Sequence, residues 1–211
     1  MRRRAGVSGA AIRLAAIANV TIVRMPDRCR VSAMIQTAIA PQNCSGTAIA
    51  TLPTDLEVSI SREIDAPRHL VFRAWTSPDL VRRWWAGRLG EVTVADVDLR
   101  VGGKWRQVTV MGGGFEIALH GEYREVVPNE RIVSTEIYEA TAGGPAQPGA
   151  VADEHLLLHT VTFAELDGRT ILTLLIHCPS KEERDLVVTS WVEAGMQEQW
   201  DLLEQIAISL R

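Results

Sequence analysis

The chain has 211 residues, a formal net charge of -4, 46% hydrophobic residues and 23% charged residues. This length allows one sizeable folded domain with a tail. The composition is that of an ordinary soluble globular protein and lacks the basic stripe of a nucleic-acid binder. The cysteines Cys29, Cys44 and Cys178 lie far apart without CxxC spacing, which argues against a disulfide framework and a zinc site and favours a reducing, cytoplasmic location.

Residues 1–55 differ in composition from the remainder of the chain. They are rich in Ala, Ile, Thr and Ser and show no sustained hydrophobic period. Their basic start resembles a signal or transit peptide, but Arg13 and Arg24 interrupt the apolar run and no convincing cleavage site closes it. The run is also too short and too charged to span a bilayer. We therefore expect a disordered leader, or a translation start at Met25 or Met34, ahead of a single folded domain.

A strand and two short helices come next. Residues 57–64 (EVSISREI) alternate apolar and polar side chains, which predicts a half-buried strand. We expect Asp65 to cap a helix that has Pro67 close to its first position, and Ser77 to cap a second helix. The apolar residues of the first helix fall on one face: Leu70, Val71, Ala74 and Trp75.

From residue 91 to residue 178 the hydrophobic period becomes two, as in strands. Six segments of this kind are separated by short breaks rich in Gly, Pro and Asn, apart from one longer loop that begins at Thr141. Asp167-Gly168 is the strongest hairpin signal, because this dipeptide supplies the positive φ angles of a tight turn. Six successive strands with short connections predict an antiparallel meander.

The last segment, residues 180–211, predicts one long helix. Ser180 is a suitable N-cap, Glu182 and Glu183 lie near the positive end of the helix dipole, and apolar residues follow at helical spacing. About twenty-nine residues at 1.5 Å each give a rod of roughly 44 Å, long enough to cross a whole sheet. Gly195 in its middle suggests a close backbone approach or a bend at a cavity wall.

This order of elements, together with several sequence stretches, resembles the helix-grip proteins. The stretches are ISREIDAPRHLVFRAWTSPDLVRRWWAG, DLRVGGKWRQVTVM, HGEYREVVPNERIVSTE and TVTFAELDGRTILTLLIHC, followed by the final helix. Over residues 56–211 the chain is similar to the START-like SRPBCC superfamily and, within it, to the activator of heat-shock-protein-90 ATPase homologues. The resemblance implies an α+β fold, in which a curved antiparallel sheet of about seven strands wraps round the long C-terminal helix and leaves a cavity. Two short helices follow the first strand.

What the resemblance implies about function is a cavity and not a particular reaction. Members of the superfamily are carriers of lipids or hydrophobic ligands, or polyketide cyclases and aromatases, and fold and function are loosely tied. Binding to the chaperone is not expected, because residues 1–55 do not look like the separate chaperone-binding domain of the eukaryotic activator. No cofactor is implied. A homodimer, common among such domains, has no specific stretch to support it.

Aromatic and polar side chains are the candidates for a ligand site. The chain has six Trp against two Tyr and three Phe. Large amphipathic rings suit an aromatic or acyl ligand, although core packing explains most of them equally well. The candidate ligand-binding residues are Trp75, Trp84, Trp85, Trp105, Tyr123, His159 and Trp191.

Tyr123 and His159 are also the candidates for catalysis. Each lies among alternating apolar residues of a strand, so if both faces look inward the two side chains could together move a proton. The competing interpretation of His159 is a hydrogen-bonded core residue. A metal site has no local ligand spacing in its favour, and none is expected. Its members would have been His120, His159 and His177 with Glu122 or Glu136.

Three functions are open at this stage. The leading hypothesis is binding of a small hydrophobic or aromatic molecule between the sheet and the final helix, without catalysis. The alternative is an enzyme of the polyketide cyclase/aromatase, dehydratase or hydrolase type that uses His159 and Tyr123, with Glu122 or Arg106 at the mouth. The second alternative is an interaction or stress-related regulatory protein whose cavity is filled by its own Trp side chains.

Overall fold

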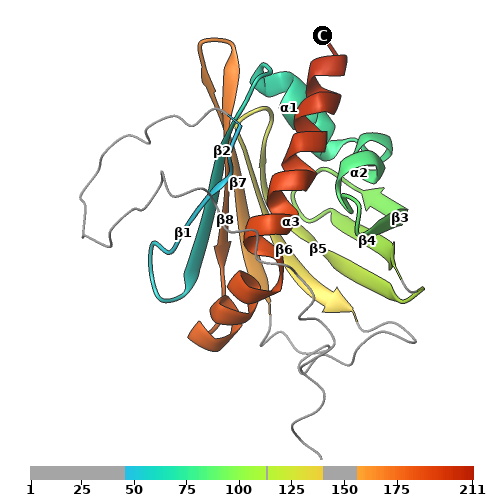
Figure 1. Ribbon diagram of the computed structural model, residues 1–211, viewed down its shortest axis with the longest axis vertical. Coiled ribbons are helices and arrows are strands. Elements are labelled where there is room, and N and C mark those ends of the chain that lie inside the picture. Colours follow the sequence, from blue (N-terminus) through green and yellow to red (C-terminus); the bar gives the residue numbers. More distant parts are fainter. Residues whose placement is uncertain (1–45, 113, 140–155) are drawn as a thin grey trace, which may run out of the picture. The chain divides into compact units, whose positions relative to one another are not determined.

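The computed structural model describes residues 46–112, 114–139 and 156–211, and of residues 190–195 the backbone alone. These residues belong to one compact unit, Gln42–Arg211. Within the described ranges the fold is α+β, with eight strands, two short helices and one long C-terminal helix (Figure 1). The elements, in chain order, are β1 (Ile49–Thr51), β2 (Glu57–Ile64), α1 (Arg68–Thr76), α2 (Pro78–Trp84), β3 (Gly90–Val97), β4 (Lys104–Met111), β5 (Glu116–Val127), β6 (Arg131–Glu139), β7 (Leu157–Leu166), β8 (Arg169–His177) and α3 (Lys181–Ser209).

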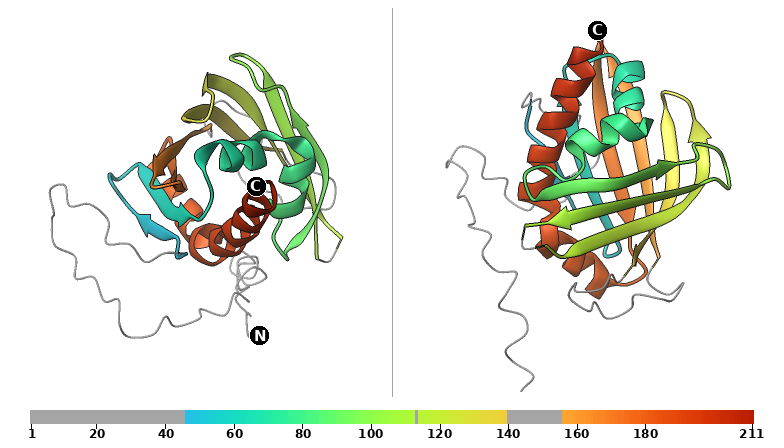
Figure 2. Two further views of the ribbon diagram at one scale, coloured as in Figure 1. Left: turned by 90° about the horizontal axis from the view of Figure 1, so that it is seen from above. Right: turned by 90° about the vertical axis from the view of Figure 1, so that its right-hand side faces the viewer.

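The described strands form one sheet in the order β1-β2-β8-β7-β6-β5-β4-β3, and neighbouring strands are antiparallel. Strands β3 to β8 form the predicted meander, and β2 joins it by pairing with β8. The β7/β8 hairpin turns at Asp167 and Gly168, whose φ angles of 52° and 77° confirm the tight turn expected there. The sheet curves, and helices α1, α2 and α3 lie on its concave side (Figure 2).

One strand of the sheet is absent from the sequence-based prediction. β1 lies within residues 1–55, which the sequence assigns to a leader, and it pairs with β2 at the edge of the sheet. Gln197 of α3 also holds this segment. Its side chain accepts a hydrogen bond from the Ala48 amide at 2.7 Å and donates one to the Gly46 carbonyl at 2.8 Å. A strand of three residues is too short for an alternating pattern to reveal.

The N-cap residue of α3 is the one predicted from the sequence, whereas that of α1 is not. The Ser180 hydroxyl accepts a hydrogen bond from the amide three residues later at 3.2 Å, as predicted. The prediction that Asp65 caps α1 is wrong, because the N-cap residue is Pro67. A free amide there, that of Arg68, donates instead to the carboxylate of Glu165 on β7 at 3.3 Å. Asp65 comes two residues too early to reach the free amides of the helix start. Its carboxylate lies 3.3 Å from Nη2 of Arg211. Ser77 is the N-cap residue of α2, but its side chain makes no capping hydrogen bond.

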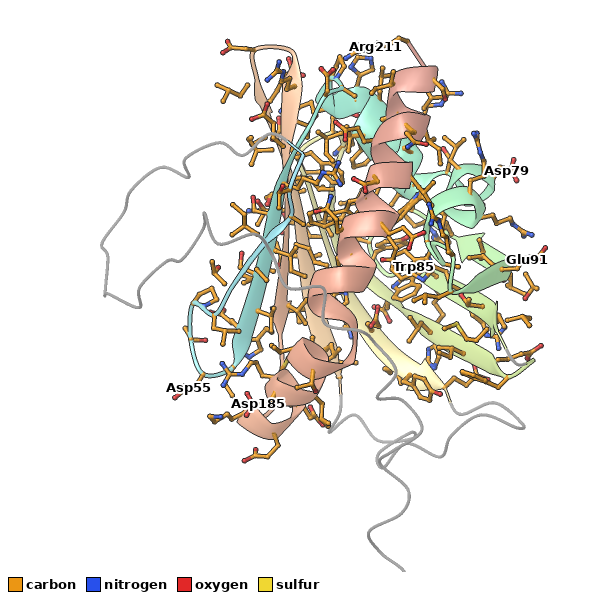
Figure 3. All side chains as sticks on the ribbon, in the orientation of Figure 1. Asp55, Asp79, Trp85, Glu91, Asp185 and Arg211 are labelled. Atoms are coloured by element: carbon orange, nitrogen blue, oxygen red, sulfur yellow. The ribbon has the colours of Figure 1, made fainter. Side chains whose placement is uncertain are left out.

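Helix α3 crosses the concave face of the sheet, with Asp185 near its N-terminus and Arg211 just beyond its C-terminus (Figure 3). Its buried side chains in the second half are Met196, Trp200, Leu203, Ile206 and Ala207. A buried cation ties the helix to the sheet: Arg62 of β2 is 4% exposed and pairs with Asp201 at 2.6 Å and with Glu204. Within the described ranges, none of the helices combines the length and the apolar character that a bilayer span requires.

Candidate functional site

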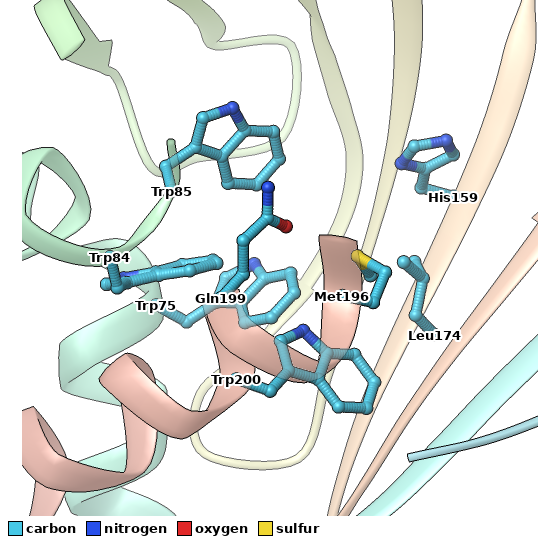
Figure 4. A pocket seen from close by; sticks show the side chains of 8 residues that line it. All are labelled: Trp75, Trp84, Trp85, His159, Leu174, Met196, Gln199 and Trp200. Atoms are coloured by element: carbon cyan, nitrogen blue, oxygen red, sulfur yellow. The ribbon is translucent and has the colours of Figure 1, made fainter. Parts of the chain in front are cut away.

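A small cavity lies between the sheet, the two short helices and α3 (Figure 4). Its volume is about 20 Å³, enough for one water molecule. Among its lining side chains, Trp75, Trp85 and Gln199 are half-buried, so the cavity approaches the surface at these three residues. The lining residues are Trp75, Trp84, Trp85, His159, Leu174, Met196, Gln199 and Trp200.

Three tryptophans of the α1–α2 region form one wall. Trp75 lies near the end of α1, Trp84 is the last residue of α2, and Trp85 follows it. The ring centroids of Trp75 and Trp84 are 5.0 Å apart and those of Trp84 and Trp85 are 5.3 Å apart, which is favourable aromatic contact. Trp84 is 1% exposed, and its Nε1 donates to the Ala74 carbonyl at 3.0 Å. Trp84 is therefore a fixed part of the wall.

Two buried nitrogen atoms at the cavity have no hydrogen-bond partner among the described residues: Nε1 of Trp200 and Nε2 of His159. Trp200 of α3 is fully buried, and His159 of β7 is 7% exposed. Their rings both border the cavity in Figure 4. A buried polar group without a partner costs about 1–3 kcal/mol, so a water molecule or a polar group of a ligand would be stabilised beside either nitrogen atom.

A buried carboxylate lies next to the imidazole of His159. Glu136 of β6 is 4% exposed, and its Oε2 is 3.7 Å from Nδ1 of His159. The register sets Glu136 opposite Leu157, two residues before His159, so both side chains are on the same face of the sheet. The distance is longer than a hydrogen bond, but a protonated imidazole would be attracted strongly across it because both groups are buried.

Trp105, which the sequence analysis proposed as a ligand-binding residue, lies in the core but does not line this cavity. It lies opposite Gly121 of β5, and its Nε1 donates to the Thr135 carbonyl at 3.1 Å. A Cβ atom at Gly121 would collide with that carbonyl and lie 2.8 Å from Nε1 of Trp105. The glycine thus lets the indole close over β5, which explains Trp105 as a packing residue.

Tyr123 is buried and shares a cross-strand row with His159, but the strand that carries Ser134 lies between them. It does not line this cavity. Burial, with a smaller effect of the Asp98 carboxylate, raises the pKa of Tyr123 above its ordinary value, so its hydroxyl holds its proton firmly. The structure therefore places His159 at the cavity and does not bring Tyr123 to it.

The other sequence candidates lie away from this cavity or outside the described side chains. Trp191 belongs to the segment of α3 whose side chains are not described. Arg106 pairs with Glu139 at 3.0 Å, and Glu122 pairs with Arg124 at 2.9 Å. Within the described ranges, no three His, Cys, Asp or Glu side chains gather as a metal site would need.

The cavity also includes residues that the sequence analysis did not propose for the site, namely Leu174, Met196, Gln199 and Trp200. Helical spacing places Met196 and Trp200 on the inner face of α3, but it does not distinguish a cavity wall from solid core. The sequence did contain a sign that Glu136 belongs to the site. It follows Ile132 and Ser134 at period two, and a carboxylate on a buried strand face needs a partner.

Comparison with known proteins agrees with this architecture. The family model described as "Activator of Hsp90 ATPase homolog 1-like protein" matches residues 65–207, from just before α1 into the last turns of α3. The chain belongs to this family. Membership of the Activator of Hsp90 ATPase homolog 1-like family confirms the resemblance inferred from the sequence. The matched range contains every lining residue of the cavity.

Solved structures of bacterial proteins have a fold similar to that of this Activator of Hsp90 ATPase homolog 1-like chain. A protein from Rhodobacter sphaeroides is 23% identical, with a TM-score of 0.66 over 77% of this chain and 99% of its own. One from Nitrosomonas europaea is 21% identical, with a TM-score of 0.63 over 75% and 98%. One from Arthrobacter aurescens is 22% identical, with a TM-score of 0.63 over 74% and 87%. No curated protein matches the chain.

Proposed function

We propose that the protein binds a small, flat hydrophobic molecule in the cavity between the sheet and α3. The observation that carries this proposal is one cavity that combines a tryptophan-rich wall with two buried nitrogen atoms lacking partners among the described residues. The indole faces supply contact area for the body of a ligand, and the nitrogen atoms suit its polar group.

The cavity must enlarge to take such a ligand. Its volume of about 20 Å³ holds one water molecule, whereas pockets for drug-sized ligands measure about 300–1,000 Å³. Trp84 is held by its hydrogen bond to Ala74, so the movable side chains of the wall are the half-buried Trp75 and Trp85. We expect Trp85 to turn outward first, because it lies beyond the last residue of α2.

A titration with the flat hydrophobic dye N-phenylnaphthylamine tests the proposal, since its emission rises when it leaves water for an apolar site. The wild-type protein should bind the dye saturably. Gln199→Phe adds a ring at the half-buried edge of the cavity and should weaken binding by about tenfold, which corresponds to about 1.4 kcal/mol. Gln205→Phe is the matched control, because Gln205 is an exposed residue of the same helix. Equal affinities of the two variants would place the dye outside this cavity.

Native mass spectrometry of the protein purified from its own host identifies the ligand directly. The proposal expects an additional mass that is lost on denaturation.

The small cavity volume also favours a second candidate function, in which the interior stays filled by tryptophan side chains and the protein acts through its surface. A chain that carries no additional mass and does not bind the dye would support that second candidate.

A further inference from the structure

We propose that Trp200 selects a ligand whose flat aromatic body carries a neutral carbonyl group, and that the carbonyl oxygen accepts a hydrogen bond from the indole N–H. This inference rests on the proposed binding function and adds the chemical class of the ligand. It depends on this one side chain, because Figure 4 shows His159 on another side of the cavity, with Met196 and Leu174 between the two rings.

The indole nitrogen of Trp200 is a buried donor in need of an acceptor. Trp200 belongs to α3 and is fully buried, and its Nε1 has no hydrogen-bond partner among the described residues. Figure 4 shows the ring edge that carries Nε1 turned towards the other lining side chains. An indole N–H donates a hydrogen bond and cannot accept one. A ligand that satisfies this atom must therefore bring an acceptor into the cavity.

The other buried indoles of the described ranges show which acceptor such a donor takes in this protein. Nε1 of Trp84 donates to the Ala74 carbonyl at 3.0 Å. Nε1 of Trp105 donates to the Thr135 carbonyl at 3.1 Å. Each of these two indoles thus meets a carbonyl oxygen of the main chain, whereas Trp200 borders a cavity. A carbonyl oxygen of a ligand would give Trp200 the same partner.

The surroundings favour an acceptor that is neutral and carries no hydrogen of its own. The described residues that line the cavity include no Arg or Lys, so a ligand carboxylate would be buried without a cation. A positive charge on His159 would already be offset by the buried carboxylate of Glu136, whose Oε2 is 3.7 Å from Nδ1. A hydroxyl group could accept from Trp200 but would add a donor that needs a further partner. A carbonyl oxygen avoids both costs.

Three naphthalene derivatives of nearly the same shape test the inference. Acetylnaphthalene carries a ketone, isopropenylnaphthalene has a methylene group in place of the ketone oxygen, and naphthoate has a carboxylate, all at the same ring position. Displacement of bound N-phenylnaphthylamine measures the affinity of each compound. The wild-type protein should bind the ketone about tenfold more tightly than the alkene, which offers no acceptor, and than the carboxylate, which is charged. Tenfold corresponds to one hydrogen bond of about 1.4 kcal/mol.

Three variants show whether Trp200 is the donor. Trp200→Phe keeps an aromatic ring on α3 and removes the N–H, so the preference for ketone over alkene should fall from about tenfold to none. Trp84→Phe is the matched control, because the N–H that it removes already donates to the Ala74 carbonyl. Gln199→Leu removes the side-chain amide from the lining. Both of these variants should retain the preference.

A second measurement uses the wild-type protein and does not depend on the folding of Trp200→Phe. A hydrogen bond weakens a C=O bond, so the carbonyl stretching band of isotope-labelled acetylnaphthalene should lie at a lower wavenumber in the complex than in hexane. The lower wavenumber should persist in Gln199→Leu. A band at the hexane position in the wild-type complex, or one that returns to it in Gln199→Leu, would overturn the assignment of the donor to Trp200.

The outcomes distinguish the two proposals. If the ketone and the alkene bind the wild-type protein equally well, or if the preference persists in Trp200→Phe, the inference is overturned and the binding function stands. Naphthoate that binds as tightly as the ketone would overturn the choice of a neutral acceptor. If the dye and all three naphthalene derivatives fail to bind, the binding function is overturned and the inference with it.

Discussion

Replacing Arg62 with Met should lower the free energy of unfolding by about 2 kcal/mol. Arg62 of β2 is 4% exposed, and its guanidinium reaches the carboxylates of Asp201 and Glu204 and the main-chain carbonyl of Gln197, all on α3. Methionine keeps most of the apolar stem and removes the charge. The substitution therefore separates the polar contacts of Arg62 from its packing.

The magnitude follows from the exposure of each partner. Removing one member of a fully buried ion pair costs about 3–5 kcal/mol. The Glu204 side chain is 19% exposed, and its carboxylate still accepts a hydrogen bond from the Asp65 amide at 2.7 Å. The Asp201 side chain is 46% exposed. Water therefore replaces part of the interaction with the guanidinium that both carboxylates lose. Nε of Arg62 is buried without a partner among the described residues, and its removal offsets about 1 kcal/mol. The expected loss is thus about 2 kcal/mol, or about 4–8 °C in Tm.

Urea unfolding followed by tryptophan fluorescence measures this loss, which should appear as a lower midpoint with an unchanged m-value. The matched control is Arg88→Met. Arg88 also pairs with a carboxylate of α3, Glu198 at 2.9 Å, but its side chain is 90% exposed and no measurable loss is expected. A double-mutant cycle of Arg62→Met with Glu204→Gln should give a coupling of about 1 kcal/mol. An Arg62→Met protein as stable as the wild type would show that burying the charge costs as much as its contacts contribute, which refutes the reasoning.

Two further predictions concern packing and burial. Gly121→Ala should lower the free energy of unfolding by about 3 kcal/mol because its Cβ would collide with the Thr135 carbonyl, whereas Gly112→Ala should be near neutral because its Cβ would lie 3.9 Å from the nearest atom. Equal urea midpoints for the two variants would contradict this. Burial raises the pKa of the Cys178 thiol to about 11. The reactivity of this thiol is measured in a chain with Cys29→Ser and Cys44→Ser, which leaves Cys178 as the cysteine that reacts. At about pH 9 a thiol reagent should modify the native protein at least about tenfold more slowly than the unfolded one. The unfolded thiol loses its proton first, so stability should fall from about pH 9 to pH 11, and a Cys178→Ala protein should lack this contribution.

The strands and the long helix could be predicted because their hydrophobic periods extend over many residues. Alternation in Glu57–Ile64 and helical spacing after Ser180 each persist long enough to exclude other conformations. The edge strand β1 has three residues and offers no such pattern. The start of α1 was misassigned because Asp65 and Pro67 are both helix-start residues, and only the backbone shows that Pro67 occupies the N-cap.

The cavity could be anticipated only in part, since the placement of Glu136 beside His159 depends on strand register. The sequence shows that His159 alternates with apolar neighbours, and it shows the same for Tyr123. It does not show that Ser134 separates these two side chains, nor that Glu136 comes opposite Leu157 and so reaches His159. Such pairings are set by turn lengths and by the irregularity of the β5/β6 pairing, which no local pattern of residues specifies.

The short strand β1 has a consequence for the solubility of the protein. β2 is a long strand with alternating buried residues, and β1 covers part of the edge that it does not share with β8. An uncovered edge of this kind is a template for intermolecular strand pairing and aggregation. Either alternative start, Met25 or Met34, would preserve this protection, whereas cutting the chain at residue 56 would remove it together with the anchoring contacts to Gln197.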